Sequence, residues 1–477
     1  MANDDLIRLG AAEAVALLRR RAVSPVELVE AAARRIEAVD GEVNALPTRF
    51  FDVARDDARR FVDASHGPAA EHPGWLAGLP IAVKDYNDVA GQRTTFGSPI
   101  FADNVAAESD LTVRTLVASG AIPIAKSNVP EFAGSNTFNP VFGATRNPWD
   151  LRKSAGGSSG GSAAALATGE VWLATGNDLG GSLRIPASFC GTVGLRPSPG
   201  RVPRGAALPP FDVLWVEGPM ARNVADLALM LDAGALPSPH DPLSLPPPAL
   251  SFQDAVRQAR PPRRVAFTPD LGLAAVDPEV AEICRAGAAR FAAMGTVVEE
   301  TGPDFAGGID AFQVLRALLF AAVRGDLLAT DRHRIAPEIV WNIEKGFQLT
   351  VAQIVEAERA RHRIFQAVAT FFDDWDLLAC PTVAVPPFPV EQRYPTEIGG
   401  VALTSYIDWM FLTFVLTLTG CPAISIPCGV TAAGLPVGLQ IVGRSQGESS
   451  LLAAAHLLEQ ELGLAGRVPI DPRTGTA

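Results

Sequence analysis

Helical spacing of apolar residues dominates the first part of the chain, from about residue 10 to residue 65. The pair Ser24-Pro25 is a helix start signal, because serine is a good N-cap and proline is tolerated in the first turn. The apolar residues behind it fall on one helical face: Val26, Leu28, Val29, Ala32 and Ile36. The pattern predicts a helical layer over residues 1–70 that packs on the remainder of the protein.

Short β-type runs and helical patterns alternate farther along the chain. Strands are predicted at residues 81–83, 122–125, 171–174, 265–267 and 297–298. Helices are predicted at residues 110–118, with Asp110 as the cap, at 162–167 before Gly169, and from Asp277-Pro278 onward. Alternation of this kind predicts an α/β protein in which helices cover both faces of a sheet.

Two proline-rich stretches, residues 237–248 and 381–395, interrupt the alternation. The first has the composition of a domain linker, but the α/β pattern continues on both sides of it. We therefore interpret it as a long surface crossing within one compact unit. The most apolar stretch, residues 409–420, is shorter than the roughly 20 residues of a membrane span. A buried helix is predicted there, and a membrane-facing patch is the alternative.

The composition narrows the class of protein. Of 477 residues, 48% are hydrophobic and 19% are charged, which excludes a disordered chain. The net charge of −12 offers no basic surface to nucleic acid or to an anionic membrane, and favours a small neutral partner. An acidic N-terminus without an apolar core predicts a cytoplasmic protein. The cysteines lack metal-ligand spacing and are interpreted as buried free thiols: Cys190, Cys284, Cys380, Cys421 and Cys428.

Two runs of glycine and serine carry the densest chemical signal. The first covers residues 154–162 (SAGGSSGGS), and the second covers residues 176–186 (GNDLGGSLRIP) after one predicted strand. Glycines tolerate positive φ and close backbone approach, so each run can direct consecutive N–H groups at one point. Such a nest of N–H groups stabilises an anion.

Several alternatives compete for the first run. A flexible linker does not usually open into a helix and a buried strand, and the spacing matches neither a phosphate-binding nor a dinucleotide-binding loop. Residues 156–160 do match the G-x-S-x-G nucleophile elbow of α/β-hydrolase-like serine esterases. An elbow needs a preceding strand, and residues 147–153 are a poor strand. It also needs a histidine base, and no downstream histidine has a distinctive setting: His240, His333, His362 and His456.

The part of the chain with the catalytic-looking motifs, residues 73–239, contains no histidine, so another base is required. The chain has four lysines against 36 arginines, and three of the four lysines fall in this part. A buried lysine can lose its proton near neutral pH, whereas arginine cannot. Lys84 is the best candidate, because an apolar strand leads into it and would desolvate its amine. Taken alone, an ion pair with Asp85 at a strand end is the more ordinary role for Lys84.

These motifs together resemble the amidase signature family. Residues 76–85 (LAGLPIAVKD) are similar to its lysine motif, and residues 156–162 (GGSSGGS) to its glycine and serine core. The second glycine run is similar to its nucleophile motif, and Ser158 and Ser182 stand 24 residues apart, as in the family pattern. The likeness weakens over about residues 235–370, a variable insertion on the substrate side.

The resemblance implies an α/β fold with a single large mixed β-sheet surrounded by helices, in which residues 71–477 form the catalytic domain. It implies Ser182 as the nucleophile, Ser158 as a bridging serine behind a cis peptide bond, and Lys84 as the general base. The oxyanion hole is then expected from four backbone N–H groups, those of Leu179, Gly180, Gly181 and Ser182.

The resemblance also assigns Asp178 and Arg184 to bracing the nucleophile loop. Two positions depart from the family pattern. Asn177 stands where threonine or serine is usual, and Arg196 stands where lysine is frequent. Neither position is expected to be catalytic.

The implied reaction is hydrolysis of the C–N bond of a small amide through an acyl-enzyme, with water as the second reactant and no metal or organic cofactor. The same groups can also cleave esters, anilides and carbamates. Aromatic and apolar residues favour aryl or alkyl amides if they line an acyl pocket, ordinary core being the alternative: Phe132, Phe138, Trp215, Trp409, Met410, Phe411 and Phe414.

Two other functions stay open. The glutaminase-type subunit of a glutamyl-tRNA amidotransferase has the same serine groups, but it usually carries an acidic residue where this chain has Met410. A catalytically inactive binding protein on the same fold is disfavoured, because all three relay residues are present. The expected assembly is a monomer or a homodimer.

Overall fold

The structure, a computed structural model, describes residues 3–63, 67–205 and 209–474. Its centre is an eleven-stranded sheet in the order β1-β3-β2-β8-β10-β9-β16-β17-β13-β11-β12. These strands are β1 (Thr48–Arg49), β2 (Leu79–Lys84), β3 (Ala121–Ser127), β8 (Leu173–Asp178), β9 (Val193–Arg196), β10 (Val216–Ala221), β11 (Arg264–Phe267), β12 (Val297–Glu300), β13 (Leu377–Pro381), β16 (Ala423–Val430) and β17 (Pro436–Val442). Parallel pairs (β2 with β3 and β8) and antiparallel pairs (β8 with β10) occur together, so the predicted single mixed sheet is confirmed.

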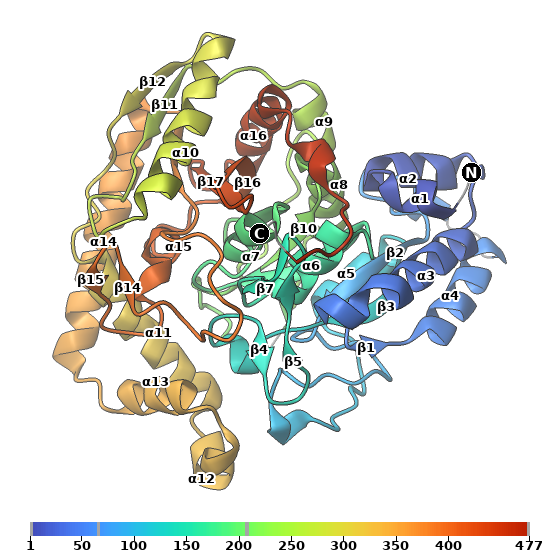
Figure 1. Ribbon diagram of the computed structural model, residues 1–477, viewed down its shortest axis with the longest axis horizontal. Helices are drawn as coiled ribbons and strands as arrows, with labels where there is room; N and C mark the ends of the chain where they lie inside the picture. The colour runs from blue at the N-terminus through green and yellow to red at the C-terminus, as the bar shows by residue number, and fades with distance from the viewer. Residues whose placement is uncertain (1–2, 64–66, 206–208, 475–477) are drawn as a thin grey trace.

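Helices surround this sheet, as Figure 1 shows. The first nine are α1 (Asn3–Arg8), α2 (Ala11–Arg19), α3 (Pro25–Val43), α4 (Phe51–Asp63), α5 (Leu111–Ala118), α6 (Gly160–Thr168), α7 (Arg184–Cys190), α8 (Val224–Gly234) and α9 (Phe252–Arg257). The others are α10 (Pro278–Ala289), α11 (Gly308–Arg324), α12 (Leu327–Asp331), α13 (Pro337–Phe347), α14 (Val351–Asp374), α15 (Phe411–Thr417) and α16 (Glu448–Leu462).

Local signals decide several helix ends. Ser24 caps α3 by accepting from the Glu27 N–H, and the Glu27 side chain accepts in return from the Ser24 N–H. Asp110 does precede α5, but its side chain makes no cap hydrogen bond, contrary to the prediction. Its carboxylate instead accepts from Asn87 Nδ2 at 3.3 Å, because it is directed toward a cavity described below.

Two strand predictions are corrected. Strand β8 begins two residues later than predicted and continues to Asp178, so Gly176 and Asn177 belong to a buried strand and not to a loop. Residues 150–154 form a strand, β7 (Asp150–Ser154), which pairs with β6 (Arg146–Asn147) in a separate two-stranded sheet. Four of its five residues are polar, so it lacks the apolar pattern that identifies a strand from sequence.

Buried apolar side chains form two clusters. The larger cluster unites the N-terminal helices, the sheet and α8 and α16. The second cluster joins the insertion helices α11, α13 and α14 to α15 and to residues beside the glycine loops, among them Leu179 and Ile185. Residues 409–420 contribute α15 to it, as the predicted buried helix. The insertion therefore packs directly on the part of the sheet that carries the glycine motifs.

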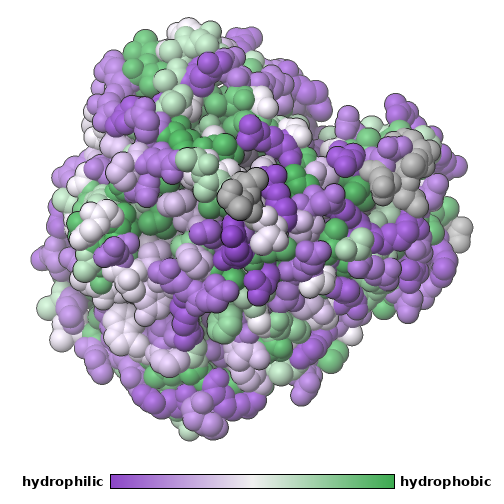
Figure 2. Space-filling view, viewed as in Figure 1, coloured by the Kyte–Doolittle hydropathy of each residue, from purple (hydrophilic) through white to green (hydrophobic). Residues whose placement is uncertain are grey.

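Polar and apolar residues are mixed over the face shown in Figure 2. Within the described ranges, no helix combines the length and apolar character that crossing a membrane requires. The proline-rich residues 237–248 lie against the loop after β9, since the Leu245 N–H donates to the Gly200 carbonyl and the Arg204 N–H to Asp241.

Candidate active site

Lys84 is the last residue of β2, at the point where the strand leaves the apolar interior. Its side chain is 0% exposed, and its backbone N–H donates to Thr175 Oγ1 on β8. Its Nζ donates to Ser158 Oγ (2.7 Å) and to Asn177 Oδ1 (2.5 Å). The structure therefore brings two of the predicted relay residues into direct contact and adds Asn177 to them.

The surroundings of Lys84 favour its neutral form. Burial lowers the pKa of Lys84 to about 7, although the carboxylates of Glu217 and Asp178 act in the opposite direction. An ion pair with Asp85 is not its role, because the Asp85 carboxylate lies 3.4 Å from Nζ of Lys126. Near neutral pH a large fraction of Lys84 is thus an amine that can accept a proton.

Ser158 lies in the turn between β7 and α6. Its side chain is buried, and the peptide bond between Gly157 and Ser158 is cis. A Cβ at position 157 would lie 2.2 Å from the carbonyl oxygen of Ser135, so only glycine fits there. The Ser158 hydroxyl is hydrogen-bonded to a lysine. The nucleophile-elbow alternative requires a histidine at this place, so the structure argues against it.

Ser182 lies in the second glycine loop, between β8 and α7. It is half-buried, and its carbonyl oxygen accepts from the Ser159 N–H at 3.3 Å. This hydrogen bond joins the two glycine runs and places Ser182 next to Ser159, the neighbour of Ser158. A substrate can reach the half-buried hydroxyl of Ser182 more easily than that of Ser158.

Asp178 is the centre of the loop that carries Ser182. Its carboxylate accepts from two nitrogens of Arg184, Nε (3.0 Å) and Nη2 (2.8 Å), and from Arg196 Nη1 (3.3 Å). Burial would raise the pKa of Asp178, but the two guanidinium groups hold it well below its usual range. Arg184 continues to Gln440 Oε1 on β17 (2.6 Å), which fixes the loop to the sheet.

The backbone of this loop requires glycine at position 181. Its φ is +123°, and a Cβ there would lie 2.3 Å from Thr413 Oγ1. The Gly181 N–H donates to Asp178 Oδ1 at 2.9 Å, so this predicted oxyanion donor is already engaged. The hydrogen bond closes the turn between Asp178 and Gly181.

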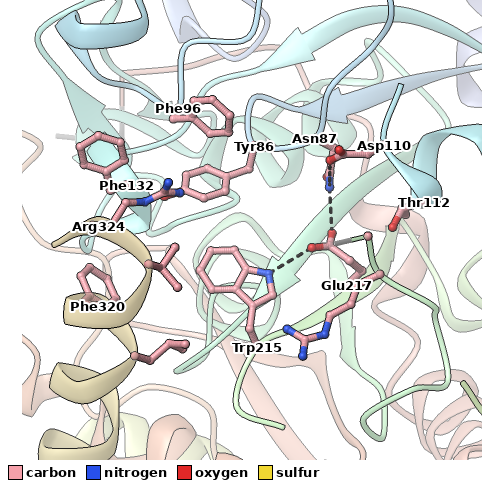
Figure 3. Close-up of a pocket in the computed structure, with 14 residues that line it drawn as sticks. Tyr86, Asn87, Phe96, Asp110, Thr112, Phe132, Trp215, Glu217, Phe320 and Arg324 are labelled. Carbon is pink, nitrogen blue, oxygen red and sulfur yellow. Dashed lines mark hydrogen bonds between the residues drawn. The ribbon is translucent and has the colours of Figure 1, made fainter. Parts of the chain in front are cut away.

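Tyr86 lines a cavity, shown in Figure 3. Its ring centroid lies 5.8 Å from Lys84 Nζ. Phe96 and Phe132 both have positive φ, 53° and 45°, which is uncommon for bulky residues. The Phe132 N–H donates to the Phe96 carbonyl at 2.9 Å, so the two backbones support each other. The aromatic lining consists of Tyr86, Phe96, Phe132, Trp215 and Phe320.

Only two of the seven predicted pocket residues, Phe132 and Trp215, line this cavity. Phe138 lines a different cavity and is 46% exposed. The others belong to or pack against the second apolar cluster, which is ordinary core: Trp409, Met410, Phe411 and Phe414. These five do not line the aromatic cavity, and for the four in the cluster the structure favours the alternative of ordinary core, because an apolar sequence run does not show which side chains face a cavity.

Two polar residues near Lys84 could not be assigned from the sequence. Asn177 is predicted to be non-catalytic, yet it contacts the lysine amine. Glu217 is 5% exposed and lines the aromatic cavity, where it accepts from Trp215 Nε1 and Asn87 Nδ2 (Figure 3). One sequence signal could have identified Glu217: it is a single acid within the apolar run WVEGPM, residues 215–220. Acidic side chains are rarely buried in a strand unless they have a specific partner.

The arrangement thus offers a buried amine of lowered pKa, a hydroxyl hydrogen-bonded to it, and a second, more accessible hydroxyl on a glycine loop. Such a set suits transfer of protons to and from an attacking serine. Within the residues that the structure describes, no group of three or more histidine, cysteine or carboxylate side chains gathers in a way that would hold a metal.

Comparison with known proteins agrees with this chemistry. The sequence profile of the family described as Amidase matches residues 27–452. The chain is 36% identical over 478 residues to an acylamidase of Rhodococcus erythropolis, with 99% of both chains covered. It is also 37% identical over 481 residues to a glutamyl-tRNA(Gln) amidotransferase subunit of Moorella thermoacetica, covering 96% of this chain and 97% of that one.

Solved structures give the same assignment. A bacterial aryl acylamidase of the amidase signature family superposes with a TM-score of 0.87 at 29% identity, covering 97% of this chain and 99% of that one. A 6-aminohexanoate cyclic dimer hydrolase in complex with substrate superposes with a TM-score of 0.86 at 29% identity and the same coverage. The chain therefore belongs to the amidase signature family and is an amide-hydrolysing enzyme.

Proposed function

We propose that this enzyme hydrolyses small aryl or alkyl carboxamides through an acyl-enzyme on Ser182, with Ser158 as the bridging serine and Lys84 as the general base. The observation that carries the proposal is the buried 2.7 Å hydrogen bond between Lys84 Nζ and Ser158 Oγ, in a glycine run that is itself hydrogen-bonded to Ser182. Amide substrate and water are its only proposed reactants.

In the proposed first step, neutral Lys84 takes the proton of Ser158, and Ser158 takes the proton of Ser182 as its oxygen attacks the carbonyl carbon. The resulting tetrahedral oxyanion collapses when the C–N bond breaks. Ser158 then delivers a proton to the departing nitrogen and regains one from Lys84. Water attacks the acyl-enzyme by the same route and releases the carboxylic acid.

The proposed oxyanion hole uses the N–H groups of Leu179, Gly180 and Ser182. The Gly181 N–H completes the predicted set, but it already donates to Asp178, so its main role is to stabilise the turn. Asp178 and Arg184 act as braces, because their ion pair is fully buried and tied to the sheet. Donors fixed in advance stabilise developing charge without reorganisation.

The proposed preference for aryl or alkyl amides rests on the aromatic cavity of Figure 3. Tyr86 and Trp215 lie against each other, with ring centroids 5.3 Å apart, and present flat apolar surface near Lys84. Holding Phe96 and Phe132 at positive φ costs of the order of 1–3 kcal/mol each, which a purely structural wall does not require. Anilides, esters and carbamates of similar shape are further proposed substrates.

The amidotransferase alternative has support from the relatives but not from the site. At the position where such a protein carries an acidic residue, Met410 offers no carboxylate for a substrate α-amino group. The carboxylate of Asp408 nearby accepts instead from Thr404 and Ser405 (2.7 and 2.5 Å). We therefore propose a stand-alone enzyme, a cytoplasmic monomer or homodimer.

A substrate panel on the purified chain tests this proposal. It contains an acetanilide, a benzamide, an aliphatic primary amide, an aryl carbamate and glutamine. We expect kcat/KM to be highest for aryl-bearing amides, and glutamine to be turned over at least about a hundredfold less efficiently, the discrimination expected when a site lacks a partner for a charged group. Glutamine as the best substrate would contradict the proposal and revive the amidotransferase function.

A further inference from the structure

Glu217 is a carboxyl group in an apolar strand. All six residues of β10 are buried, and burying a carboxylate is costly unless it is paired. The two hydrogen bonds that Glu217 accepts come from uncharged groups, Trp215 Nε1 (3.0 Å) and Asn87 Nδ2 (3.2 Å). Such a setting is expected to keep a carboxyl group protonated over much of the neutral range.

The sheet places Glu217 near Lys84. Glu217 stands directly opposite Asn177 in the antiparallel pair of β10 and β8, and residues opposite each other share one face of the sheet. On that face Asn177 Oδ1 accepts from Lys84 Nζ, at the end of the next strand, β2. The three side chains therefore form a row across three adjacent strands, with the acid at one end and the base at the other.

We propose that Glu217 is a positioning residue that decides whether Lys84 is charged: its carboxylate holds Lys84 as an ammonium, and its neutral acid leaves Lys84 as the amine that accepts from Ser158. This inference rests on the proposed role of Lys84 as the general base. Glu217 itself does not touch the reacting atoms and acts only through its charge.

The ionisation behaviour supports this geometry. Burial raises the pKa of Glu217 to about 7 and lowers the pKa of Lys84 to about 7, so both groups titrate over the same range. Groups coupled in this way lose their protons in two steps that belong to the pair. Asp178 also favours the charged form of Lys84, but Arg184 and Arg196 already neutralise it.

The other charged or titratable groups around Glu217 do not replace it. Asp110 raises the pKa of Glu217 by repulsion across Asn87. Arg204 pairs with Asp212 at 3.6 Å. Arg324 lies over the rings of Phe96 and Phe132, and burial raises the pKa of Tyr86 to about 12, so that it stays neutral.

The test is the dependence of kcat/KM on pH in the wild type, in Glu217→Gln and in Glu170→Gln. Glu170 is a matched control, because it is another fully buried acid of raised pKa, but its partner is Thr168 and its charged neighbours lie away from the site. Removing the Glu217 charge lowers the pKa of Lys84, so the acid limb of Glu217→Gln should move to lower pH by at least about half a unit. It should also fit one ionisation where the wild type needs two, and Glu170→Gln should match the wild type.

Two further variants secure the test. Glu217→Asp keeps a carboxylate, so its acid limb should stay nearer to that of the wild type than the limb of Glu217→Gln does. Should Glu217→Gln not fold, Trp215→Phe removes the donor that favours the carboxylate, which raises the pKa of Glu217 and should also move the limb to lower pH.

An unmoved acid limb in the folded Glu217→Gln or Trp215→Phe variant overturns the inference, whatever happens to kcat. An equal shift in Glu217→Asp and Glu217→Gln also overturns it, because then side-chain shape and not charge is responsible. The proposed function fails separately, through a wild type that does not cleave amides or a Lys84→Arg variant that does.

Discussion

At the residue scale, the proposed chemistry depends on removing water from one lysine. Lys84 is fully buried at a strand end, and its Nζ donates to oxygen atoms of Ser158 and Asn177. Burial penalises the ammonium more than the two nearby carboxylates favour it, so the pKa falls toward neutrality. The same amine on the surface would stay protonated and could not accept the proton of a serine.

Lys84→Arg tests whether proton acceptance is the role of this residue. Arginine keeps the charge but does not deprotonate, so turnover should fall at least about a thousandfold, or roughly 4 kcal/mol of transition-state stabilisation, as in Lys84→Ala. In the wild type, activity should fall as the pH drops through the pKa of Lys84, near 7, because the ammonium form accumulates. A folded Lys84→Arg enzyme that kept more than about a tenth of wild-type turnover would show that Lys84 only positions other groups.

Covalent labelling distinguishes the two serines. A fluorophosphonate should modify Ser182, because its side chain is half-buried while Ser158 is 0% exposed behind it. Peptide mass mapping of the labelled wild type, with Ser182→Ala and Ser158→Ala as matched variants, gives the position. We expect the adduct to disappear in Ser182→Ala and to form more slowly in Ser158→Ala. An adduct on Ser158 in the wild type would reverse the assignment.

At the scale of elements, the loop between β8 and α7 carries the proposed oxyanion hole at the end of a strand. Asp178, the last residue of β8, gathers the Gly181 and Leu183 N–H groups and the Arg184 guanidinium. Thr413 on α15 closes the loop from the other side, since its Oγ1 donates to the Gly180 carbonyl at 2.7 Å. The loop is therefore held by both the sheet and a helix of the second core.

Gly181→Ala should disrupt this loop. The added Cβ would meet Thr413 Oγ1 at 2.3 Å at a φ of +123°, so the turn must shift and carry the N–H groups with it. We expect kcat to fall by about a hundredfold or more, as for loss of one oxyanion donor. Gly41→Ala is the control: it lies in α3 with nothing within 4 Å, and should keep kcat while gaining about 0.5–1 kcal/mol of stability. Equal activity of the two variants would contradict the role of the loop.

At the scale of the whole molecule, the two apolar clusters have different relations to the site. The larger cluster joins the N-terminal helices to the sheet and to α8 and α16. The second cluster holds the insertion helices, and α11 carries Phe320 and Arg324 into the wall of the aromatic cavity. Because α13 packs against α11, a change within the second cluster should reach the cavity without touching the serines.

A pair of truncations tests this division. Ile343→Ala in α13 and Leu28→Ala in α3 both remove a 0% exposed side chain, and each should cost about 2–5 kcal/mol of unfolding free energy. Only Ile343→Ala should raise KM for aryl amides several-fold, because the support of α11 is loosened. Urea unfolding and steady-state kinetics measure both effects. A comparable rise of KM in Leu28→Ala would show that the cavity depends on global stability alone.

Local pattern determined much of this protein from the sequence alone. Periodicity found α3, an apolar stretch found α15, and the scarcity of lysine pointed to Lys84, while the resemblance of the two glycine runs to a known family assigned Ser158 and Ser182. These signals lie within short stretches of chain. Local pattern did not identify β7, whose polar residues form part of a small separate sheet. It also did not identify the lining of the aromatic cavity, because a buried core and a cavity wall have the same apolar composition.

Only the tertiary structure placed residues 84, 177 and 217 in one row. These positions lie 93 and 40 residues apart along the chain. The order β2-β8-β10 brings them together: Glu217 stands opposite Asn177, and Asn177 accepts from Lys84 Nζ. Tertiary packing also decides the partner of Asp110. Its carboxylate makes no helix-cap hydrogen bond and accepts instead from Asn87, beside Glu217. Strand order and register depend on packing of the whole chain, so the electrostatic surroundings of the base cannot be read from any single segment.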